Sequence, residues 1–432
     1  SFDKWCSKKI DSIFLMTANQ SPSQQRPAMK TAVEALSLIL SQVRATSVVE
    51  MVDTQHALGR VLAEDLLSQV DVPPADNTQM DGYAVRTADV KAVGTILKVA
   101  QRIPAGHVGT LLESGAAARI FTGANIPPGA DAVVMQELSE LQGDQVTILE
   151  MPQKGQWIRI QGEDLTAGLP ALKQGTLLRP QELGVAASAG YAQLPVFRKI
   201  KVATFFTGDE LTMPGQPLKP GSIYNSNRDT LLGCIRAMGC EATDLGIVPD
   251  SFDATRAALR QAAVDHDLVI TSGGVSVGEE DHMKPAVTAE GHLDMWQIAI
   301  KPGKPLAFGT INQATGKSNP QTFFMGLPGN PVASYVTFLL FARPFIAALQ
   351  GRGLIKTPEM QVRADFDWPK ADRRNEFLRV RLNDQGGLDL FPNQGSGVLT
   401  SASWADGLVD NPPNQTIKSG DMVKYLPFSG ML

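Results

Sequence analysis

The chain has 432 residues, of which 43% are hydrophobic, and its formal net charge at pH 7 is −5. This hydrophobic content excludes global disorder, and the length corresponds to about three domains of ~150 residues each. The weakly acidic charge argues against a nucleic-acid-binding protein, because such proteins need a basic surface to displace counterions. It does not exclude a local basic pocket for a small anion.

Cysteine and histidine patterns argue against a disulfide scaffold or a zinc site. The three cysteines contain no C-x-x-C pair, and the five histidines form no H-E-x-x-H motif. Any metal is therefore expected to be a hard cation that is bound by carboxylates. Neither a signal sequence nor a run of ~18 uninterrupted apolar residues is recognisable, so we expect a cytoplasmic protein without a membrane span.

The N-terminal half predicts an extension followed by two intertwined domains. Residues 1–26 are expected to be an extension that is disordered or in part not native, with Met16 as an alternative start. Residues 27–47 carry apolar side chains at helical spacing, and together with residues 165–198 they predict a helical and extended N-terminal domain. Between them, residues 48–164 contain short strands broken by Pro and Gly clusters, which predicts an inserted, irregular β-rich domain.

The C-terminal half predicts an α/β domain and a small β domain. In residues 199–350, strands alternate with helices, which indicates a doubly wound parallel sheet with helices on both faces. One of these strands is the apolar run 268–270, and a long apolar helix is expected over residues 331–349. Residues 356–432 return to alternating strands, which fits a small β-barrel or sandwich.

The strongest local signal is the glycine-rich segment 271–278, with the sequence TSGGVSVG, directly after the apolar strand. Ligands bind at the carboxyl ends of strands in such a sheet, and glycines allow the backbone N–H groups to approach an anion. The alternative is an ordinary strand-to-helix turn, which its position and length make less favoured. The segment is neither a Walker A loop nor a dinucleotide-binding G-x-G-x-x-G.

Carboxylates gather at the same predicted edge of the sheet. Helix capping alone explains Asp253 and Glu279. Asp281 and Glu210 are different, because acids beside a phosphate loop repel the ligand unless a divalent cation intervenes, which predicts Mg²⁺. The carboxylates at this edge are Glu210, Asp250, Asp253, Glu279, Glu280 and Asp281.

Two further rigid loops are predicted to converge on this edge. Residues 300–305 place the ammonium groups of Lys301 and Lys304 on a turn that is bracketed by prolines, although a merely solvated turn is an equal alternative locally. Residues 326–331, with the sequence GLPGNP, again end a strand and start a helix. A compact site with two lysines and exposed amides suits a small oxyanion.

Together, these segments resemble the MoeA family of molybdopterin molybdenumtransferases, whose relatives include the E domain of gephyrin. The resemblance extends from about residue 27 to the C-terminus. Each motif alone is weak, but their number and order make the resemblance specific. The segments that carry it are residues 76–84 (DNTQMDGYA), 119–124 (RIFTGA), 162–164 (GED), 207–211 (TGDEL), 225–227 (NSN), 272–278 with Asp281, 301–305 (KPGKP) and 326–331.

The resemblance implies the final step of molybdenum cofactor synthesis. Adenylylated molybdopterin and molybdate would be the substrates, the adenylate would be hydrolysed in a step that depends on a divalent cation, and molybdenum would be left on the dithiolene. The resemblance also implies an elongated homodimer of four-part subunits, in which the third part resembles molybdopterin adenylyltransferase. Transient contacts with that adenylyltransferase and with molybdoenzyme targets would follow, without nucleic-acid or membrane partners.

The resemblance also implies roles for individual residues. Metal or nucleotide phosphates are expected at Asp250 and Asp281, and molybdate at a set that includes Lys301 and Lys304. The catalytic residues that it implies are Asp81, Asp164, Glu210, Asp250, Asp281 and Lys301. The substrate-binding residues that it implies are Thr122, Ser272, Gly273, Gly274, Ser276, Lys301, Lys304, Pro328, Pro331, Arg374 and Ser396.

Three positions depart from the family pattern or match it ambiguously. Gln297 and Ala333 stand where some relatives carry a lysine and a serine, respectively. Arg373 is an alternative to Arg374, because the match there is ambiguous by one residue.

Two other functions stay open. The first is a scaffold with a gephyrin-like fold, but a scaffold need not retain the acidic residues and both lysines. The second is the adenylyltransferase itself, which is expected as a single domain without flanking regions of ~170 and ~80 residues.

Overall fold

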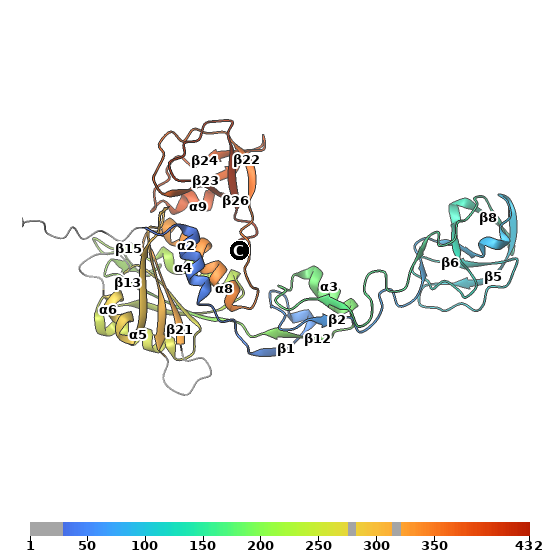
Figure 1. Cartoon of the computed structure of the whole chain (residues 1–432), viewed down its shortest axis with the longest axis horizontal. Coiled ribbons are helices and arrows are strands. Elements are labelled where there is room, and N and C mark those ends of the chain that lie inside the picture. Colours follow the sequence, from blue (N-terminus) through green and yellow to red (C-terminus); the bar gives the residue numbers. More distant parts are fainter. Residues whose placement is uncertain (1–28, 275–281, 313–320) are drawn as a thin grey trace, which may run out of the picture.

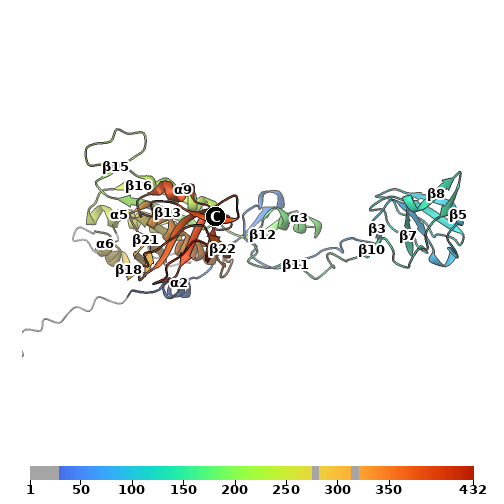
Figure 2. The same cartoon turned by 90° about the horizontal axis from the view of Figure 1, so that it is seen from above.

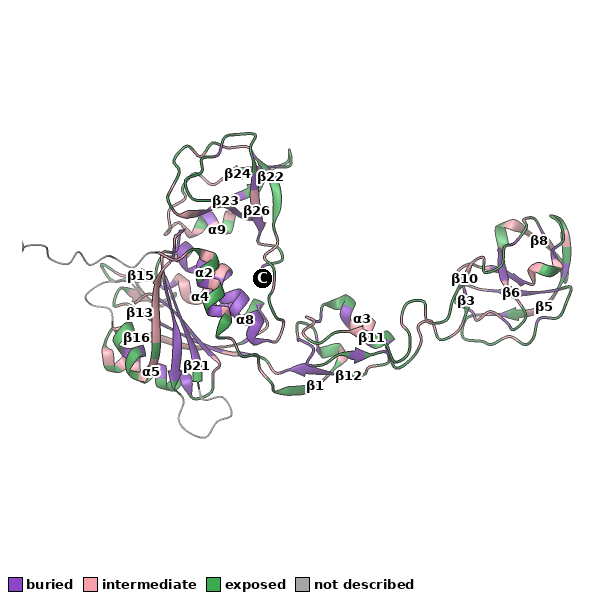
Figure 3. Ribbon diagram, in the orientation of Figure 1, coloured by how far each residue is buried: buried purple, intermediate pink, exposed green. Residues whose placement is uncertain are grey.

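The computed structural model describes residues 29–274, 282–312 and 321–432, so the N-terminal extension predicted for residues 1–26 lies outside the described residues. The molecule is elongated, with a β-rich region at one end and an α/β domain plus a small barrel at the other (Figures 1 and 2). Buried residues are concentrated in the sheets and in the helix faces that pack on them (Figure 3).

The central domain is built on a six-stranded sheet. The first four strands in spatial order are parallel, whereas β20 runs antiparallel to both of its neighbours. The predicted α/β fold class is therefore confirmed, with one reversed strand in an otherwise parallel sheet. The spatial order is β16 (Glu241–Val248), β13 (Lys201–Thr207), β17 (Leu268–Ser272), β21 (Gln321–Leu327), β20 (Pro305–Asn312) and β18 (Gly291–Gln297).

Helices cover both faces of this sheet, because successive strand residues point to opposite sides. On β13, Val202 and Phe206 belong to one apolar cluster, while Ala203 and Phe205 belong to the other. The first cluster is covered by α2 (Ala32–Ser41), α4 (Ser226–Ala237), α7 (Pro331–Thr337), a π-helical turn (Phe338–Ala342) and α8 (Arg343–Leu349). The second is covered by α5 (Phe252–Ala263) and α6 (Met283–Glu290).

The segment formed by α7, the π-helical turn and α8 is the long apolar helix predicted from the sequence. In the described part of the chain, Pro331–Leu349 is the one helix that has the length and composition to cross a membrane, and 89% of its most apolar window is buried inside the protein. Its apolar residues therefore belong to the core of the central domain.

The chain that precedes the central domain forms two parts, joined by a ribbon. The proximal region packs around Leu62, Leu194 and Val196. It consists of β1 (Val49–Asp53) with β12 (Gln193–Phe197), β2 (Leu66–Leu67) with β11 (Pro170–Leu172), a 3₁₀ turn (Thr54–His56) and α3 (Pro180–Ser188). The ribbon pairs β3 (Asn77–Thr78) with β10 (Ile158–Arg159).

The distal region, beyond the ribbon, contains a six-stranded sheet with its own apolar clusters. Its spatial order is β7 (Ala132–Met135), β4 (Gly82–Val85), β6 (Ala116–Ile120), β5 (Thr95–Ile103), β9 (Gln145–Ile148) and β8 (Ser139–Gln142), with 3₁₀ turns at Thr87–Asp89 and Gln136–Leu138. Figure 1 places it at the opposite end of the molecule from the central domain.

The C-terminal barrel is closed, because β25 pairs with both β26 and β23. This decides between the barrel and the sandwich that the sequence left open. The central domain adds a short strand, β19, in parallel register with β23. The elements are β19 (Ile300–Lys301), β22 (Met360–Ala364), β23 (Asn375–Leu382), β24 (Gly387–Leu390), α9 (Leu399–Trp404), β25 (Gly407–Asn411) and β26 (Met422–Pro427).

Gly82 is the residue on which the packing of the distal sheet can be tested. It lies on β4, between β6 and β7, and a Cβ atom there would lie 2.0 Å from the Val134 carbonyl oxygen. We expect Gly82→Ala to destabilise the distal region by ~1–3 kcal/mol through overpacking. Amide hydrogen exchange of β4 measures this effect.

Gly184→Ala is the matched control, because nothing lies within 4 Å of a Cβ atom at that helical position. Protection of β4 that is as strong in Gly82→Ala as in the control would contradict the close approach of these strands.

Candidate active site

A cavity of about 740 Å³ opens where the carboxyl ends of β13, β17 and β21 face the C-terminal barrel. Its size is that of a pocket for a cofactor-sized ligand. The central domain contributes most of the wall, and the barrel closes one side. The residues that line the cavity are Thr207, Glu210, Leu211, Ile223, Tyr224, Asn225, Ser226, Asn227, Ser272, Gly273, Gly274, Lys301, Pro302, Gly303, Lys304, Pro305, Pro328, Gly329, Asn330, Pro331, Ala333, Arg374, Gln394, Gly395 and Ser396.

One wall is the glycine turn after β17. The Ser272 hydroxyl is buried, donates to the carbonyl oxygen of Pro328 at 2.9 Å and accepts from Asn227 Nδ2 at 2.8 Å. Asn227 Nδ2 also donates to the carbonyl oxygen of Gly329 at 2.7 Å, so the start of α4 joins the glycine turn to the loop after β21. Gly273 and Gly274 have φ values of +96° and +64°, which favour glycine. Of the predicted glycine loop, Ser276 lies outside the described residues, as does the following Asp281.

The turn between β19 and β20 carries two lysines that line the cavity. Gly303 has a φ of +114°, and a Cβ atom there would lie 2.6 Å from the hydroxyl oxygen of Thr337. The turn therefore lies directly on α7, which fixes the positions of Lys301 and Lys304. Lys304 makes no ion pair with any residue in the described ranges.

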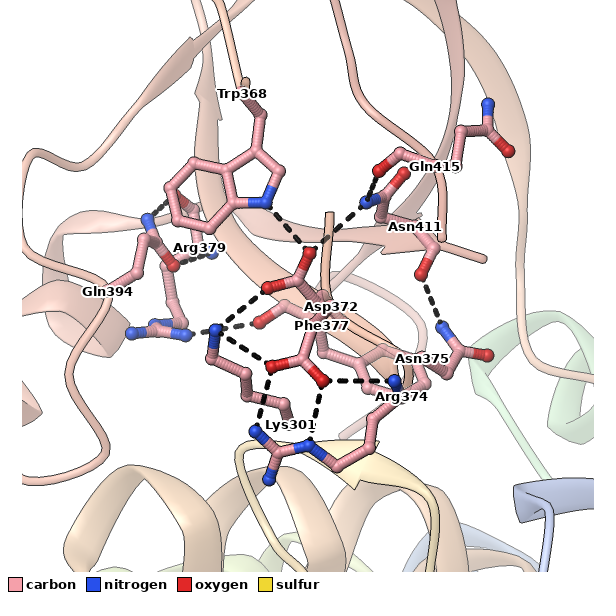
Figure 4. Close-up of polar contacts among 11 residues, drawn as sticks. Lys301, Trp368, Asp372, Arg374, Asn375, Phe377, Arg379, Gln394, Asn411 and Gln415 are labelled. Carbon is pink, nitrogen blue, oxygen red and sulfur yellow. Dashed lines mark hydrogen bonds and ion pairs between the residues drawn. The ribbon is translucent and has the colours of Figure 1, made fainter. Parts of the chain in front are cut away.

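Lys301 belongs to a cluster of four charged side chains at the junction with the barrel (Figure 4). Its Nζ lies 3.0 Å from Glu376 Oε1 and 3.3 Å from Asp372 Oδ2. Arg374 donates from Nε and Nη2 to the two oxygens of Asp372 at 3.0 and 2.9 Å. These hydrogen bonds from Arg374 hold the pKa of Asp372 far below its usual value.

A buried arginine holds the barrel loop that closes the cavity. Arg379 is 1% exposed and donates to the carbonyl oxygens of Gly395 and Phe377 at 3.2 and 3.1 Å. Its backbone N–H donates to Gln394 Oε1 at 2.9 Å. The same loop reaches α7, because the carbonyl oxygen of Ser396 accepts a hydrogen bond from the Val332 N–H. Burial lowers the pKa of Arg379 to about 10. This value is still well above neutral pH, so the guanidinium remains charged.

The structure places many of the predicted site residues in this cavity. They are Glu210, Ser272, Gly273, Gly274, Lys301, Lys304, Pro328, Pro331, Arg374 and Ser396. Arg374 rather than Arg373 lines the wall, and so does Ala333, whereas Gln297 ends β18 and does not. Asp250 is exposed just beyond β16, at the same edge of the sheet but outside the wall.

Three predicted residues lie far from this cavity. Asp81 and Thr122 are in the distal region, where the Thr122 N–H and hydroxyl donate to Asp81 Oδ1 at 2.8 and 2.7 Å. These two hydrogen bonds lower the pKa of Asp81. Asp164 is exposed near the ribbon, where its N–H donates to the carbonyl oxygen of Val72. None of the three therefore lines the cavity.

Asp372 and Glu376 belong to the site, although the sequence motifs did not single them out. Asp372 precedes the predicted ligand Arg374 by two residues, which was a usable signal for a local ion pair. Glu376 gave no such signal, because its contact with Lys301 bridges 75 residues. Asn227 was recognised only as part of a motif, although it ties the glycine turn to the next loop.

Proteins of a known family are similar to this chain along nearly its whole length. The molybdopterin molybdenumtransferase of Haemophilus influenzae is 38% identical over 411 residues, covering 94% of this chain and 100% of the relative. The molybdopterin molybdenumtransferase of a Nostoc species is 34% identical over 417 residues, which cover 94% of each chain. The crystal structure of the molybdopterin biosynthesis MoeA protein from Pyrococcus horikoshii covers 93% of this chain and 100% of its own, with 29% identity and a TM-score of 0.80.

Fold and cavity together define a class, that of multidomain α/β proteins with a cofactor-sized cavity at the carboxyl edge of a central sheet. Three family models match in order: the MoeA N-terminal region (domain I and II) over residues 30–190, the "probable molybdopterin binding domain" over residues 203–348, and the MoeA C-terminal region (domain IV) over residues 361–428. The chain belongs to the MoeA family, which confirms the resemblance that its motifs carry.

Arg379→Lys tests whether one guanidinium holds the loop of Gln394 and Ser396. The guanidinium donates to three acceptors, the carbonyl oxygens of Gly395 and Phe377 and the hydroxyl oxygen of Ser401. A lysine cannot reach all three, and each buried acceptor left unsatisfied costs ~1–3 kcal/mol. We expect a lower free energy of unfolding, measured in urea, and faster amide exchange in residues 391–398.

Arg381→Lys is the matched control on the same strand, because Arg381 is exposed and stacks on Trp404. If the two variants lose equal stability, Arg379 does not anchor the loop.

Proposed function

We propose that this protein is a molybdopterin molybdenumtransferase, which inserts molybdate into adenylylated molybdopterin with hydrolytic release of AMP. The observation that carries the proposal is the cavity itself. It gathers Lys301, Lys304 and Arg374 beside the glycine turn of residues 273–274, in a chain of the MoeA family. Molybdate is a tetrahedral dianion, and charged donors on rigid loops are suitable receptors for it.

The oxyanion subsite is proposed at the junction of the central domain and the barrel. Lys301 and Arg374 approach from the two sides of this junction, and Lys304 lines the same wall without an ion pair to a described residue. Ser396 adds a hydroxyl from the barrel loop. A volume of about 740 Å³ leaves room for the pterin and its adenylate beside the oxyanion.

Hydrolysis of the adenylate breaks one phosphoanhydride bond. A water oxygen bonds to the adenylate phosphorus, the bond from that phosphorus to the bridging oxygen breaks, and AMP leaves the molybdopterin phosphate. Glu210 is the only carboxylate among the described residues that line the cavity, so we assign to it the uptake of the proton that the water loses. The N–H groups of the glycine turn suit the phosphate oxygens.

A divalent cation fits the carboxylates at this edge. Glu210 and Asp250 are both exposed, and neither forms an ion pair within the described ranges, so phosphates placed here would meet uncompensated negative charge. We propose that Asp250 and Asp281 hold Mg²⁺, although Asp281 lies outside the described residues. When bound, Mg²⁺ would neutralise charge on the phosphates. The described residues alone contain no cluster of three metal-ligating side chains.

The site is proposed to be completed by a second subunit. Asp81 and Thr122 belong to the distal region and Asp164 lies near the ribbon, so none of the three lines the cavity of its own chain. Figure 1 shows the distal region at the end of the molecule opposite the central domain. A homodimer would allow the distal region of one copy to reach the cavity of the other. The exposed apolar side chains of Val49 and Met51 on β1 are compatible with burial between copies.

The alternatives that the sequence left open are less consistent with the site. A single-domain adenylyltransferase would lack the wall that Arg374 and Ser396 contribute from the barrel. A pure scaffold has no need for the lysines that line the cavity. We therefore favour a cytoplasmic enzyme that makes transient contacts with the adenylyltransferase and with molybdoenzyme targets.

Lys301→Gln tests the oxyanion subsite while leaving an amide donor for Glu376. Loss of one charged hydrogen bond typically costs ~1.5–3 kcal/mol, so we expect molybdate affinity to fall by roughly 10- to 150-fold. High molybdate should restore part of the cofactor yield.

Asp281→Asn should lower AMP release by at least ~10²-fold, the scale of one preorganised electrostatic contact, and molybdate should not rescue it. Titration with molybdate while AMP and cofactor are measured separates the two defects.

Lys284→Gln, an exposed position on α6, is the control for loss of one lysine charge. Equal rescue of Lys301→Gln and Asp281→Asn by molybdate, or rescue of neither, would mean that the two ligands are assigned to the wrong loops.

Subunit mixing tests the shared site. Light scattering should give twice the chain mass of 46.3 kDa. Asp81→Asn and Lys301→Gln should each be impaired alone. An equimolar mixture should regain roughly a quarter of wild-type activity, because half of the dimers are mixed and each mixed dimer contains one intact site of two. A monomer mass, or mixtures no more active than their components, would exclude this arrangement.

A further inference from the structure

Two of the three cations proposed to bind molybdate, Lys301 and Arg374, are already paired in this structure. Asp372 accepts two hydrogen bonds from the Arg374 guanidinium at 3.0 and 2.9 Å, and it lies 3.3 Å from Lys301 Nζ (Figure 4). Glu376 lies 3.0 Å from the same Nζ. Two positive and two negative side chains give this cluster a net charge of zero. A dianion that approached it would meet two carboxylates together with the two cations.

Glu376 is a fixed member of the cluster. It is 1% exposed, it lies on β23 opposite Lys301 of β19, and its other oxygen accepts a hydrogen bond from Trp368 Nε1 at 2.8 Å. Asn411 Nδ2 contacts that oxygen at 3.4 Å. Moving this carboxylate would break contacts inside the barrel, so Glu376 stays in place when a ligand enters.

Asp372 is differently held. It precedes β23 in a loop, its side chain is 19% exposed, and every side-chain partner recorded for it in the described chain belongs to Lys301 or Arg374. If its carboxylate turned toward water, it would therefore lose only contacts with the two residues that are proposed to bind the oxyanion. Its carboxylate has the charge and the planar oxygen pair that suit these donors.

We propose that Asp372 is an internal competitor for the oxyanion. Its carboxylate occupies Lys301 and Arg374 when no oxyanion is bound, and molybdate binds by displacing it. The proposal rests on the proposed function, because it takes these two cations as part of the molybdate subsite. Asp372 thereby determines the affinity for molybdate, because a dianion replaces a monoanion on the same two donors. The net free energy of binding is the difference between the contacts that molybdate makes with Lys301 and Arg374 and those that Asp372 gives up.

Protonation does not release Asp372 at neutral pH. While Asp372 is paired, the Arg374 guanidinium holds its pKa far below the usual value. Once displaced into water, it has the ordinary pKa of an aspartate, about 4, so the carboxylate is ionised in both states. The exchange is therefore one anion for another, and water must solvate the carboxylate that leaves. The partial exposure of the side chain allows this.

The test is molybdate binding to Asp372→Asn, measured by isothermal titration calorimetry on the full chain. An asparagine keeps the oxygen that accepts the Arg374 N–H at 3.0 Å, but it removes the competing charge. We expect molybdate to bind ~10-fold more tightly, the scale of one charged hydrogen bond that need not be broken. The apparent KM for molybdate should fall in parallel. In a Lys301→Gln background the gain should shrink.

Asp365→Asn is a matched control in the same barrel. Asp365 also pairs with an arginine two residues away, at 2.6 and 2.9 Å from Arg363, and this pair lowers its pKa to about 2. The pair does not line the cavity. We expect no change in molybdate affinity there, which separates release of the two cations from a general loss of negative charge.

The outcomes separate this inference from the proposed function. If Lys301→Gln weakens molybdate binding while Asp372→Asn leaves it unchanged or weakens it, the competitor is excluded, and Asp372 positions Arg374 instead. If neither variant changes molybdate binding, the oxyanion subsite itself is wrong. Asp372→Ser, which also lacks the charge, repeats the measurement should the asparagine variant fail to fold, and it must show the same gain.

Discussion

The pairing of two short backbone segments holds the site together. Ile300 and Lys301 of β19 run parallel to Asn375 and Glu376 of β23, so a strand from the central domain is added to the sheet of the barrel. Without this pairing, the lysine turn and the arginine loop would belong to two separate surfaces. With it, Lys301 comes within hydrogen-bond distance of a buried carboxylate, and the cavity gains a wall from the barrel. The Ser396 to Val332 hydrogen bond fastens the same junction at a second point.

Much of the central part of the site was predictable because it follows from local rules. An apolar strand followed by two glycines defines the position of the ligand edge, and the loops after β17 and β21 meet there because parallel strands end at one edge. Gly273 and Pro328 could be assigned in this way, whereas Lys304 reaches the same edge because it directly precedes the reversed strand β20. The reversed direction of β20 was not predicted, because the apolar pattern of a strand does not show whether it runs parallel or antiparallel to its neighbours.

What could not be predicted depends on contacts between distant segments. The contact between Lys301 and Glu376 bridges 75 residues, and no spacing rule applies over such a length. The separation of Asp81 from the cavity has the same cause. Its motif is as specific as that of the glycine turn, yet only the three-dimensional course of the ribbon shows how far from the cavity it lies.

The ribbon of β3 and β10 makes the distal region a self-contained insertion with apolar clusters of its own. The chain enters through Asn77–Thr78 and returns through Ile158–Arg159, and Arg159 is the direct partner of Asn77. Two backbones paired in this way lie only ~5 Å apart, a gap that a tight hairpin can close. The whole distal region is therefore inserted at a point where a short hairpin turn could connect the two strands. Replacing the whole module by a short turn would therefore leave the register of the two strands that carry it unchanged.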